Sequence, residues 1–304
     1  MESQQREKVR SGQRPIPRRR RVIALALVGM QGWLSGCPSG LPQGGVITDP
    51  GRITGILADR ATRVRSLRAQ GSADQFGRNG RVRGEVAIVV QTPDRIRFDM
   101  FAFGTLVSSL VSDGQRFGLL QGRQYAIGPA RACAARQLAG IPLEGREIAA
   151  VLSGGVPALG TPTGPVRWIN GFYVLEMRGD EGRTARLELE LPDEQRAWVP
   201  ARQVPRVHRI VLRDREGVRA EITYSHYRVV QGDAYPERVR VEMPRDSVDM
   251  QVRFDRIEPG PVGGEPTAPP VDPDDPFGGG QPGQNDPFRI APPAGTEVVT
   301  IDCV

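Results

Sequence analysis

Lysine, histidine and cysteine are scarce in this chain, and this scarcity limits the kinds of binding site that the sequence can be said to contain. Among 304 residues there is one lysine, Lys8, and there are two histidines, His208 and His226. Neither histidine has a second histidine or a cysteine close by at the spacing of metal ligands, so the sequence predicts no metal site. Because arginine supplies almost all of the positive charge, single arginines are poor indicators of phosphate binding.

Catalytic and nucleotide-binding motifs are missing as well. The sequence contains no Gly-x-Ser-x-Gly, no His-Glu-x-x-His, no P-loop and no dinucleotide fingerprint. The aspartates within residues 272–286 lack the spacing and the closing glutamate of a calcium loop. The sequence therefore predicts a protein that is not an enzyme and that has no cofactor. A hydrolase whose polar groups converge only in the fold is the alternative.

The net charge of +6 would suggest a nucleic-acid partner, but the excess of basic over acidic residues is confined to the start of the chain. Residues 1–36 hold eight of the 41 basic residues and two of the 35 acidic residues, which leaves 33 of each in the remainder. In that remainder the arginines alternate with acids instead of forming a basic run. We therefore predict no nucleic-acid partner.

The chain also has no long apolar run; residues 22–30 are apolar but too few to span a bilayer as a helix. An arginine-rich stretch, residues 18–21, precedes this run, which is the layout of a secretory signal. The run is followed by Leu34-Ser35-Gly36-Cys37, which resembles the lipobox of bacterial lipoprotein signals. The resemblance implies cleavage before Cys37 and acylation of its thiol, so that the only prosthetic group expected is the covalent lipid.

Two or more acyl chains hold a protein firmly on a membrane, so the membrane is an expected partner. Residue 38 is proline, whereas aspartate at this position retains many lipoproteins in the inner membrane. By this resemblance we expect a lipid anchor on the periplasmic face of the outer membrane, with retention in the inner membrane as the alternative. Residues 37–50 then form a lipidated, Gly/Pro-rich tether.

Residues 51–258 are expected to form the main domain. Asp49 and Pro50 have the residue types of a helix N-cap and first helical position. Apolar residues at helical spacing predict one amphipathic helix over 51–67. They are Ile53, Ile56, Leu57, Val64 and Leu67.

After residue 67 the apolar period changes from helical spacing to two, which predicts strands with one covered face and one wet face. Two helix-prone segments, 130–139 and 143–152, interrupt the strands. This order predicts a mainly β (α+β) fold with one large curved antiparallel sheet, whose apolar face is covered by few helices. The predicted strands include 106–111, 116–121, 171–178, 183–191, 206–213, 218–228, 237–243 and 247–257.

Residues 259–287 contain nine prolines and seven glycines, which predicts a disordered excursion. Residues 288–304 regain strand character, and we expect them to return to the sheet. Cys133 and Cys303 remain once Cys37 is lipidated, and two such cysteines in an exported protein often pair. We favour a Cys133–Cys303 disulfide over two separate thiols.

Several segments in this order resemble the LolA/LolB-like lipoprotein carriers over most of residues 51–257. The resemblance is carried by four short stretches: Ser66 to Gly71, Pro93 to Phe98, Phe101 to Val107, and Pro142 to Pro157. It implies an incomplete antiparallel barrel whose concave face is covered by an N-terminal helix and two short helices. It also implies a cavity for acyl chains of lipoproteins or for other lipids.

The candidate cavity lining is the apolar side of the strands, although the same side chains could equally fill a core. These residues are Ile96, Phe98, Met100, Leu187, Leu189, Val252 and Phe254. Phe101, Phe103 and Leu106 surround Gly104, where the resemblance implies a loop that touches membrane or cargo. The alternative for this loop is a buried hairpin end.

The sequence thus predicts a membrane-anchored lipoprotein that binds acyl chains and acts in lipoprotein or lipid transfer, in outer-membrane biogenesis. Segment 143–152 would be a movable lid. The alternative from another class is a structural or interaction lipoprotein that uses a filled, curved sheet as a scaffold.

Overall fold

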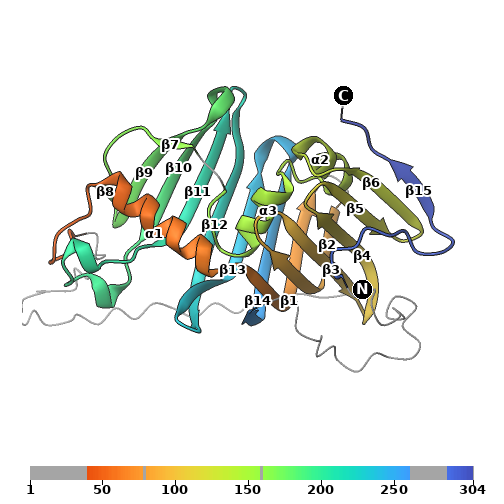
Figure 1. The fold of residues 1–304 in the computed structure, drawn as a ribbon, viewed down its shortest axis with the longest axis horizontal. Coiled ribbons are helices and arrows are strands. Elements are labelled where there is room, and N and C mark those ends of the chain that lie inside the picture. The colour runs from red at the N-terminus through yellow and green to blue at the C-terminus, as the bar shows by residue number, and fades with distance from the viewer. Residues whose placement is uncertain (1–39, 78–79, 158–159, 261–285, 304) are drawn as a thin grey trace, which may run out of the picture. The chain divides into compact units, whose positions relative to one another are not determined.

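The computed structural model describes residues 40–77, 80–157, 160–260 and 286–303. The expected signal peptide, the lipidation site Cys37 and most of the Pro/Gly-rich segment lie outside these residues. Within them, three α-helices and one large antiparallel sheet make up the fold (Figure 1).

The helices are α1 (Pro50–Arg63), α2 (Ala132–Ala139) and α3 (Gly145–Leu152), and short 3-10 turns include η2 (Asp193–Gln195) and η3 (Pro200–Arg202). The strands of the first half are β1 (Ser66–Gly77), β2 (Gly80–Gln91), β3 (Arg95–Ala102), β4 (Thr105–Asp113), β5 (Arg116–Gln121) and β6 (Gln124–Pro129). Those of the second half are β7 (Thr161–Pro162), β8 (Arg167–Ile169), β9 (Phe172–Arg178), β10 (Thr184–Glu190), β11 (Arg206–Asp214), β12 (Gly217–Val230), β13 (Asp233–Met243), β14 (Val248–Pro259) and β15 (Glu297–Thr300).

The sheet runs in the order β15-β6-β5-β4-β3-β2-β1-β14-β13-β12-β11-β10-β9-β7, with β8 beside β9. The two halves join where β1 pairs with β14, and at Gly71 the register of this pair shifts. All pairs are antiparallel except β15 with β6. The edges do not close on each other, so the sheet is an incomplete barrel.

Helix α1 begins as its sequence predicts, because the Asp49 carboxylate accepts the Gly51 N–H at 2.9 Å and Pro50 is the first helical residue. It ends earlier than the predicted residue 67, at Arg63. Leu67 is buried, but it belongs to β1, where it pairs with Val90. The predicted helix was too long because Val64 and Leu67, which follow α1, are also buried in the core and continue its apolar spacing into β1.

The main core lies between the concave face of the sheet and the three helices. Alternate residues of each strand point into it, such as Val86, Ile88 and Val90 of β2. From α3 it receives Ile148, Val151 and Leu152. The mainly β (α+β) fold class is therefore confirmed, with one large open antiparallel sheet whose concave face carries three helices.

A second, smaller cluster covers the convex face of β3–β6. Residues 286–293, which we call the strap, lie there with Phe288 buried, and Arg97 donates to the Pro287 carbonyl. Phe288 packs under the Arg95 guanidinium, whose carbon lies 4.5 Å from the ring centre. The apolar side chains that the strap covers lie outside the main core: Val111, Leu120 and Tyr125.

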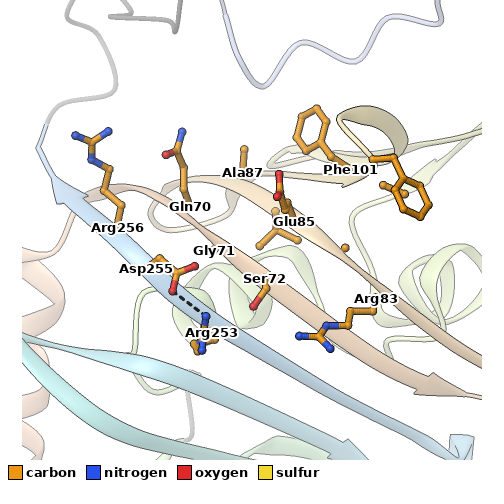
Figure 2. Close-up of a pocket in the computed structure, with 14 residues that line it drawn as sticks. Gln70, Gly71, Ser72, Arg83, Glu85, Ala87, Phe101, Arg253, Asp255 and Arg256 are labelled. Atoms are coloured by element: carbon orange, nitrogen blue, oxygen red, sulfur yellow. Dashed lines mark ion pairs between the residues drawn. The ribbon is translucent and has the colours of Figure 1, made fainter.

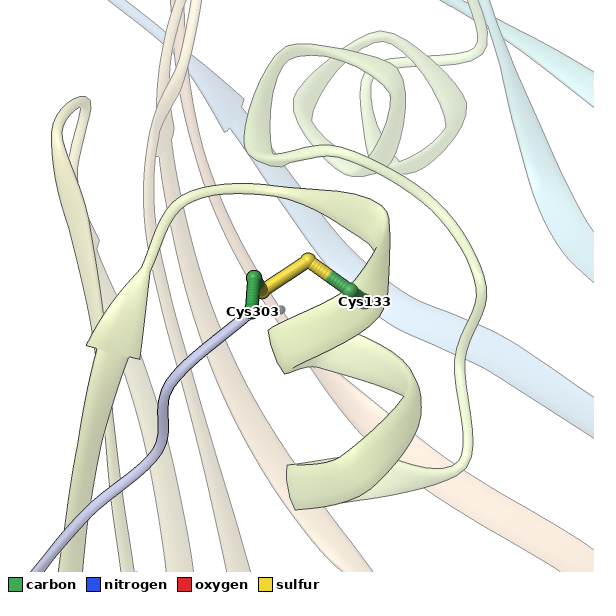
Figure 3. Close-up of a disulfide and its surroundings, with 2 residues drawn as sticks. All are labelled: Cys133 and Cys303. Atoms are coloured by element: carbon green, nitrogen blue, oxygen red, sulfur yellow. A yellow bond between two sulfur atoms is a disulfide. The ribbon is translucent and has the colours of Figure 1, made fainter.

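The chain then passes from the convex face to the concave face around β6. Strand β15 adds parallel to β6, and Ile301 donates to Ile127 at 2.7 Å. Cys303 forms the predicted disulfide with Cys133 on α2 (Figure 3). Only four residues of the expected strand segment 288–304 are in a strand, because the strap crosses the sheet instead of extending it.

Candidate functional site

A cavity of about 790 Å³ lies between α1, α3 and the concave face of the second half-sheet. Helix α1 contributes residues at helical spacing, and Met177 and Leu187 form the floor from β9 and β10. Arg60, Arg65 and Arg146 supply the positive charges of the wall. The apolar part of the wall includes Leu57, Ala58, Ala61, Val64, Pro93, Ala150, Val156 and Pro157.

Arg60 holds the end of α3 beside α1. Its guanidinium donates to the Ser153 carbonyl at 2.9 Å and to the Ala234 carbonyl at 3.1 Å, and it lies 5.7 Å from the centre of the Tyr235 ring. The same end of α3 is held from below, because the Tyr224 hydroxyl donates to the carbonyls of Val151 at 3.2 Å and Gly155 at 2.8 Å.

Burial raises the pKa of the Tyr224 hydroxyl well above its ordinary value, and the neighbouring Tyr227 adds to the rise while Arg60 opposes it. Burial likewise raises the pKa of Tyr227, whose hydroxyl donates to the Val207 carbonyl. Tyr224 therefore keeps its proton at neutral pH and remains a donor to α3.

The other end of α3 is fixed by Glu147. One carboxylate oxygen accepts the Glu144 N–H at 2.9 Å, which closes a capping box, and the other accepts the guanidinium of Arg219 on β12. Both side chains of this ion pair are largely buried, at 8% and 12% exposure. Helix α3 is thus attached to the sheet at both ends by polar contacts, with the cavity beside it.

Of the predicted lining residues, Leu187 lies in the wall of this cavity. The other six lie elsewhere in the concave core: Ile96, Met100, Leu189, Val252 and Phe254 are buried, and Phe98 packs against the core from a partly buried position. The helix side of the wall was not predicted; it consists of Leu57, Ala58, Arg60 and Ala61 of α1, Ala150 of α3 and residues 153–157 after it. The α1 part of this wall could have been predicted, because Leu57 and Ala61 of α1 and Val64 just after it recur at helical spacing on one face.

A second hollow, of about 860 Å³, lies on the convex face where β14, β1 and β2 meet (Figure 2). Its side chains are mostly polar, and Arg253 pairs with Asp255 at 3.3 Å across its floor. It forms at the Gly71 bulge, where a Cβ would lie 1.9 Å from the Arg253 carbonyl oxygen. This hollow has charged walls and is a poor site for hydrocarbon.

The Phe101–Leu106 hairpin end borders the polar hollow. Phe103 is fully exposed at a positive φ of 52°, while Phe101 and Leu106 are half-buried. A buried hairpin end, the alternative from the sequence, therefore does not describe Phe103.

Among the described residues, no cluster of three or more histidine, cysteine or acidic side chains could hold a metal ion. None of the helices in this part of the chain is long and apolar enough to cross a membrane.

No family model matches the chain, and no curated protein matches its sequence significantly. Solved structures are similar in fold. One is a domain described as an outer-membrane lipoprotein-sorting protein, from Vibrio parahaemolyticus, with a TM-score of 0.49, 10% identity, and coverage of 70% of this chain and 94% of that one. A LolA superfamily protein from Nitrosomonas europaea has a TM-score of 0.47 and 11% identity, with coverage of 71% of this chain and 96% of that one. A DUF1329 family protein from Desulfovibrio piger has the same score and identity, with 71% and 95% covered. At these scores and identities the likeness says nothing about what this chain binds.

Proposed function

We propose that this chain is a non-enzymatic, membrane-anchored lipoprotein that takes acyl chains of lipoproteins or other lipids into the cavity between α1 and α3. The observation that carries the proposal is the cavity itself. Its volume of about 790 Å³ falls within the roughly 300–1,000 Å³ range of ligand sites, and its wall is largely apolar. Burying one methylene there is worth about 0.8 kcal/mol, so a modest length of acyl chain gives useful affinity.

The way in which helix α3 is held is consistent with a cavity that can open. Helix α3 is held by the packing of Ile148, Val151 and Leu152 together with hydrogen bonds and an ion pair, and none of its described attachments to the sheet is covalent. All of these contacts can break and reform without chemistry, and acyl chains entering the cavity would cover the apolar side chains that opening exposes, so α3 can act as the lid. Arg60 contributes to both functions, because it borders the cavity and holds the lid.

In this proposal the membrane anchor is the lipid on Cys37. Because residue 38 is proline and not the aspartate that retains many lipoproteins in the inner membrane, the proposed location is the periplasmic face of the outer membrane, with the inner membrane as the alternative. The exposed Phe103 hairpin end, with Phe101 and Leu106, is the proposed contact for incoming cargo. Transfer of lipoproteins or lipids in outer-membrane biogenesis is the role that this combination would serve.

The test measures lipid bound by the chain from residue 38 onward, purified from a bacterial envelope, by native mass spectrometry followed by lipid extraction. Uptake of cis-parinaric acid, whose fluorescence rises in apolar sites, gives the affinity. Ala58→Trp places a large ring inside the cavity from an exposed helix position and leaves the core untouched. If the ring displaces two methylenes, affinity falls roughly tenfold.

Asp59→Trp is the matched control, because residue 59 is the next position of α1, is exposed and is not part of the cavity wall. It should bind as the unchanged chain does. A protein that carries no lipid from the envelope and takes up no cis-parinaric acid would exclude the carrier function and leave the scaffold alternative.

A further inference from the structure

The N-terminal stalk of the described chain, residues 40–48, is bound to the fold instead of hanging free. Gly44 donates to the Arg196 carbonyl at 3.1 Å, and Ile47 donates to the Tyr173 hydroxyl at 3.3 Å. A Cβ on Gly44 would lie 2.0 Å from the Trp198 carbonyl oxygen, so the stalk and residue 198 are in direct backbone contact. Figure 1 shows this red segment beside the green-blue turns η2 and η3.

A buried glutamine fixes the two segments to each other. Gln203 is fully buried, and its amide nitrogen donates to the carbonyls of Gly45 at 3.0 Å and Trp198 at 2.7 Å. Its amide oxygen accepts the Tyr173 hydroxyl. The connection between β10 and β11, residues 191–205, is therefore a rigid surface joined to the stalk, and we call residues 193–204 the platform.

Exposed apolar side chains gather on the platform and on the stalk beside it. Leu41 is 71% exposed, Trp198 42%, Val199 55% and Val204 45%. Exposed tryptophan with aliphatic neighbours is characteristic of the interface between lipid and water. The charges in residues 193–204 are balanced, with Asp193 and Glu194 against Arg196 and Arg202, so apolar contact would dominate.

Chain length places this surface near the anchor. Pro42 is buried in the fold, and five residues of fully extended chain from Cys37 to Pro42 span at most about 18 Å. Acylated Cys37 must lie at the membrane surface, since its chains enter the hydrocarbon. The platform therefore cannot move far from the headgroups.

The Phe103 hairpin end is not beside this anchor. Connections of an antiparallel sheet alternate between its two ends, which places the turn between β3 and β4 at the end opposite the β10–β11 connection. Strand β3 also lies seven strands away from β10 in the sheet.

We propose that the platform, through Leu41, Trp198, Val199 and Val204, docks on the bilayer that holds the anchor and fixes how the domain stands on it. The Phe103 end is then free to meet cargo away from the anchor. The proposal rests on acylation of Cys37, as in the proposed function, but not on the cavity.

The test uses the lipidated full-length protein, processed to begin at Cys37, in vesicles of phosphatidylethanolamine and phosphatidylglycerol. Part of the lipid carries bromine in the upper acyl chain, which quenches nearby tryptophan. Trp168→Phe leaves Trp198 as the only tryptophan of the processed chain. Its emission should shift to the blue and be lost to the brominated lipid.

The matched control carries Trp168→Phe, Trp198→Phe and Phe103→Trp, and its emission should be insensitive to bromine. Quenching of that control without quenching of Trp198, or no quenching of either, would overturn the proposal. Intact mass confirms acylation of each sample first, so a failed anchor is distinguished from a failed platform, and lipid uptake by the cavity is measured separately.

A second pair of variants needs no change at Trp198. Val199→Glu with Val204→Glu should reduce the quenching of Trp198, whereas Val298→Glu, on an equally exposed valine of β15, should not. Circular dichroism confirms that all variants are folded. Unchanged quenching in the double variant would also overturn the proposal.

Discussion

The two faces of the sheet are covered in different ways. On the concave face, α1 and α3 leave a cavity, and α3 is held by Arg60, Tyr224 and the Glu147–Arg219 pair. On the convex face, the strap leaves Phe288 fully packed, and the chain beyond it ends in a disulfide. The cover beside the cavity is held by non-covalent contacts, whereas the chain that forms the strap continues around β6 and is cross-linked to α2 by the disulfide.

This difference predicts two kinds of variant. Changes at the lid should alter both stability and ligand uptake, whereas changes at the strap and its disulfide should alter stability and leave ligand binding unchanged. The predictions below test that distinction, from the largest expected effect to the smallest.

Glu147→Gln should have the largest effect, because it leaves the Arg219 charge buried without its carboxylate. Breaking a buried ion pair costs about 3–5 kcal/mol. Urea unfolding should show this loss, together with weaker retention of cis-parinaric acid. Adding Arg219→Met should recover part of the stability, and a double variant no more stable than the single one would contradict the role of the pair.

Cys133→Ser should lower the free energy of unfolding by about 2–5 kcal/mol, since the disulfide closes a separation of 170 residues. Cys303→Ser should behave alike, and reductant should lower the melting temperature of the unchanged chain only. Ligand affinity should stay the same in both variants. A fall in affinity equal to that of the lid variants would break the separation of the two faces.

Tyr224→Phe should cost about 1–3 kcal/mol, because the Val151 and Gly155 carbonyls lose a buried donor. The lid should open more often, so release of cis-parinaric acid in stopped-flow measurements should be faster than in the unchanged chain. Equal release rates would show that Tyr224 does not hold the lid.

High pH should loosen the concave side gradually. The pKa values of Tyr224 and Tyr227 are raised above their ordinary value of 10.0, so the folded chain holds these protons more tightly than the unfolded chain. The contribution of these raised pKa values to the free energy of unfolding is complete below pH 10 and is lost as the pH rises above 10. Unfolding free energies measured across this range should fall less steeply when both tyrosines are replaced by phenylalanine.

Much of the fold follows from local pattern. The sequence predicted β5, after a hairpin turn, with the bounds that the structure has, Arg116–Gln121, and alternation predicted β10 within one residue at each end. Strands β6, β7 and β8 were missed: β6 has buried Tyr125 but no strict alternation, and β7 and β8 are only two and three residues long. Their pairing is decided by neighbouring strands, which local sequence does not encode.

The site was less predictable for a geometric reason. Leu187 and Leu189 have the same period and the same face of β10, yet only Leu187 lies in the cavity wall. Period identifies the face of a strand but not which stretch of that face a helix covers. The position of α1 is set by contacts far along the chain, such as Arg63 with Asp233 and Arg52 with the Ala201 carbonyl.

The place of Cys303 near the end of the chain has a consequence for biogenesis. Three cysteines allow three pairings, and two of them involve Cys37. If the chain is exported as proposed, Cys133 remains a thiol until Cys303, 170 residues further along, has followed it, and Cys37 is the nearer cysteine in the sequence. Acylation of Cys37 before Cys303 arrives would prevent both pairings that involve Cys37. The timing of acylation relative to export would then decide whether oxidation forms the Cys133–Cys303 disulfide.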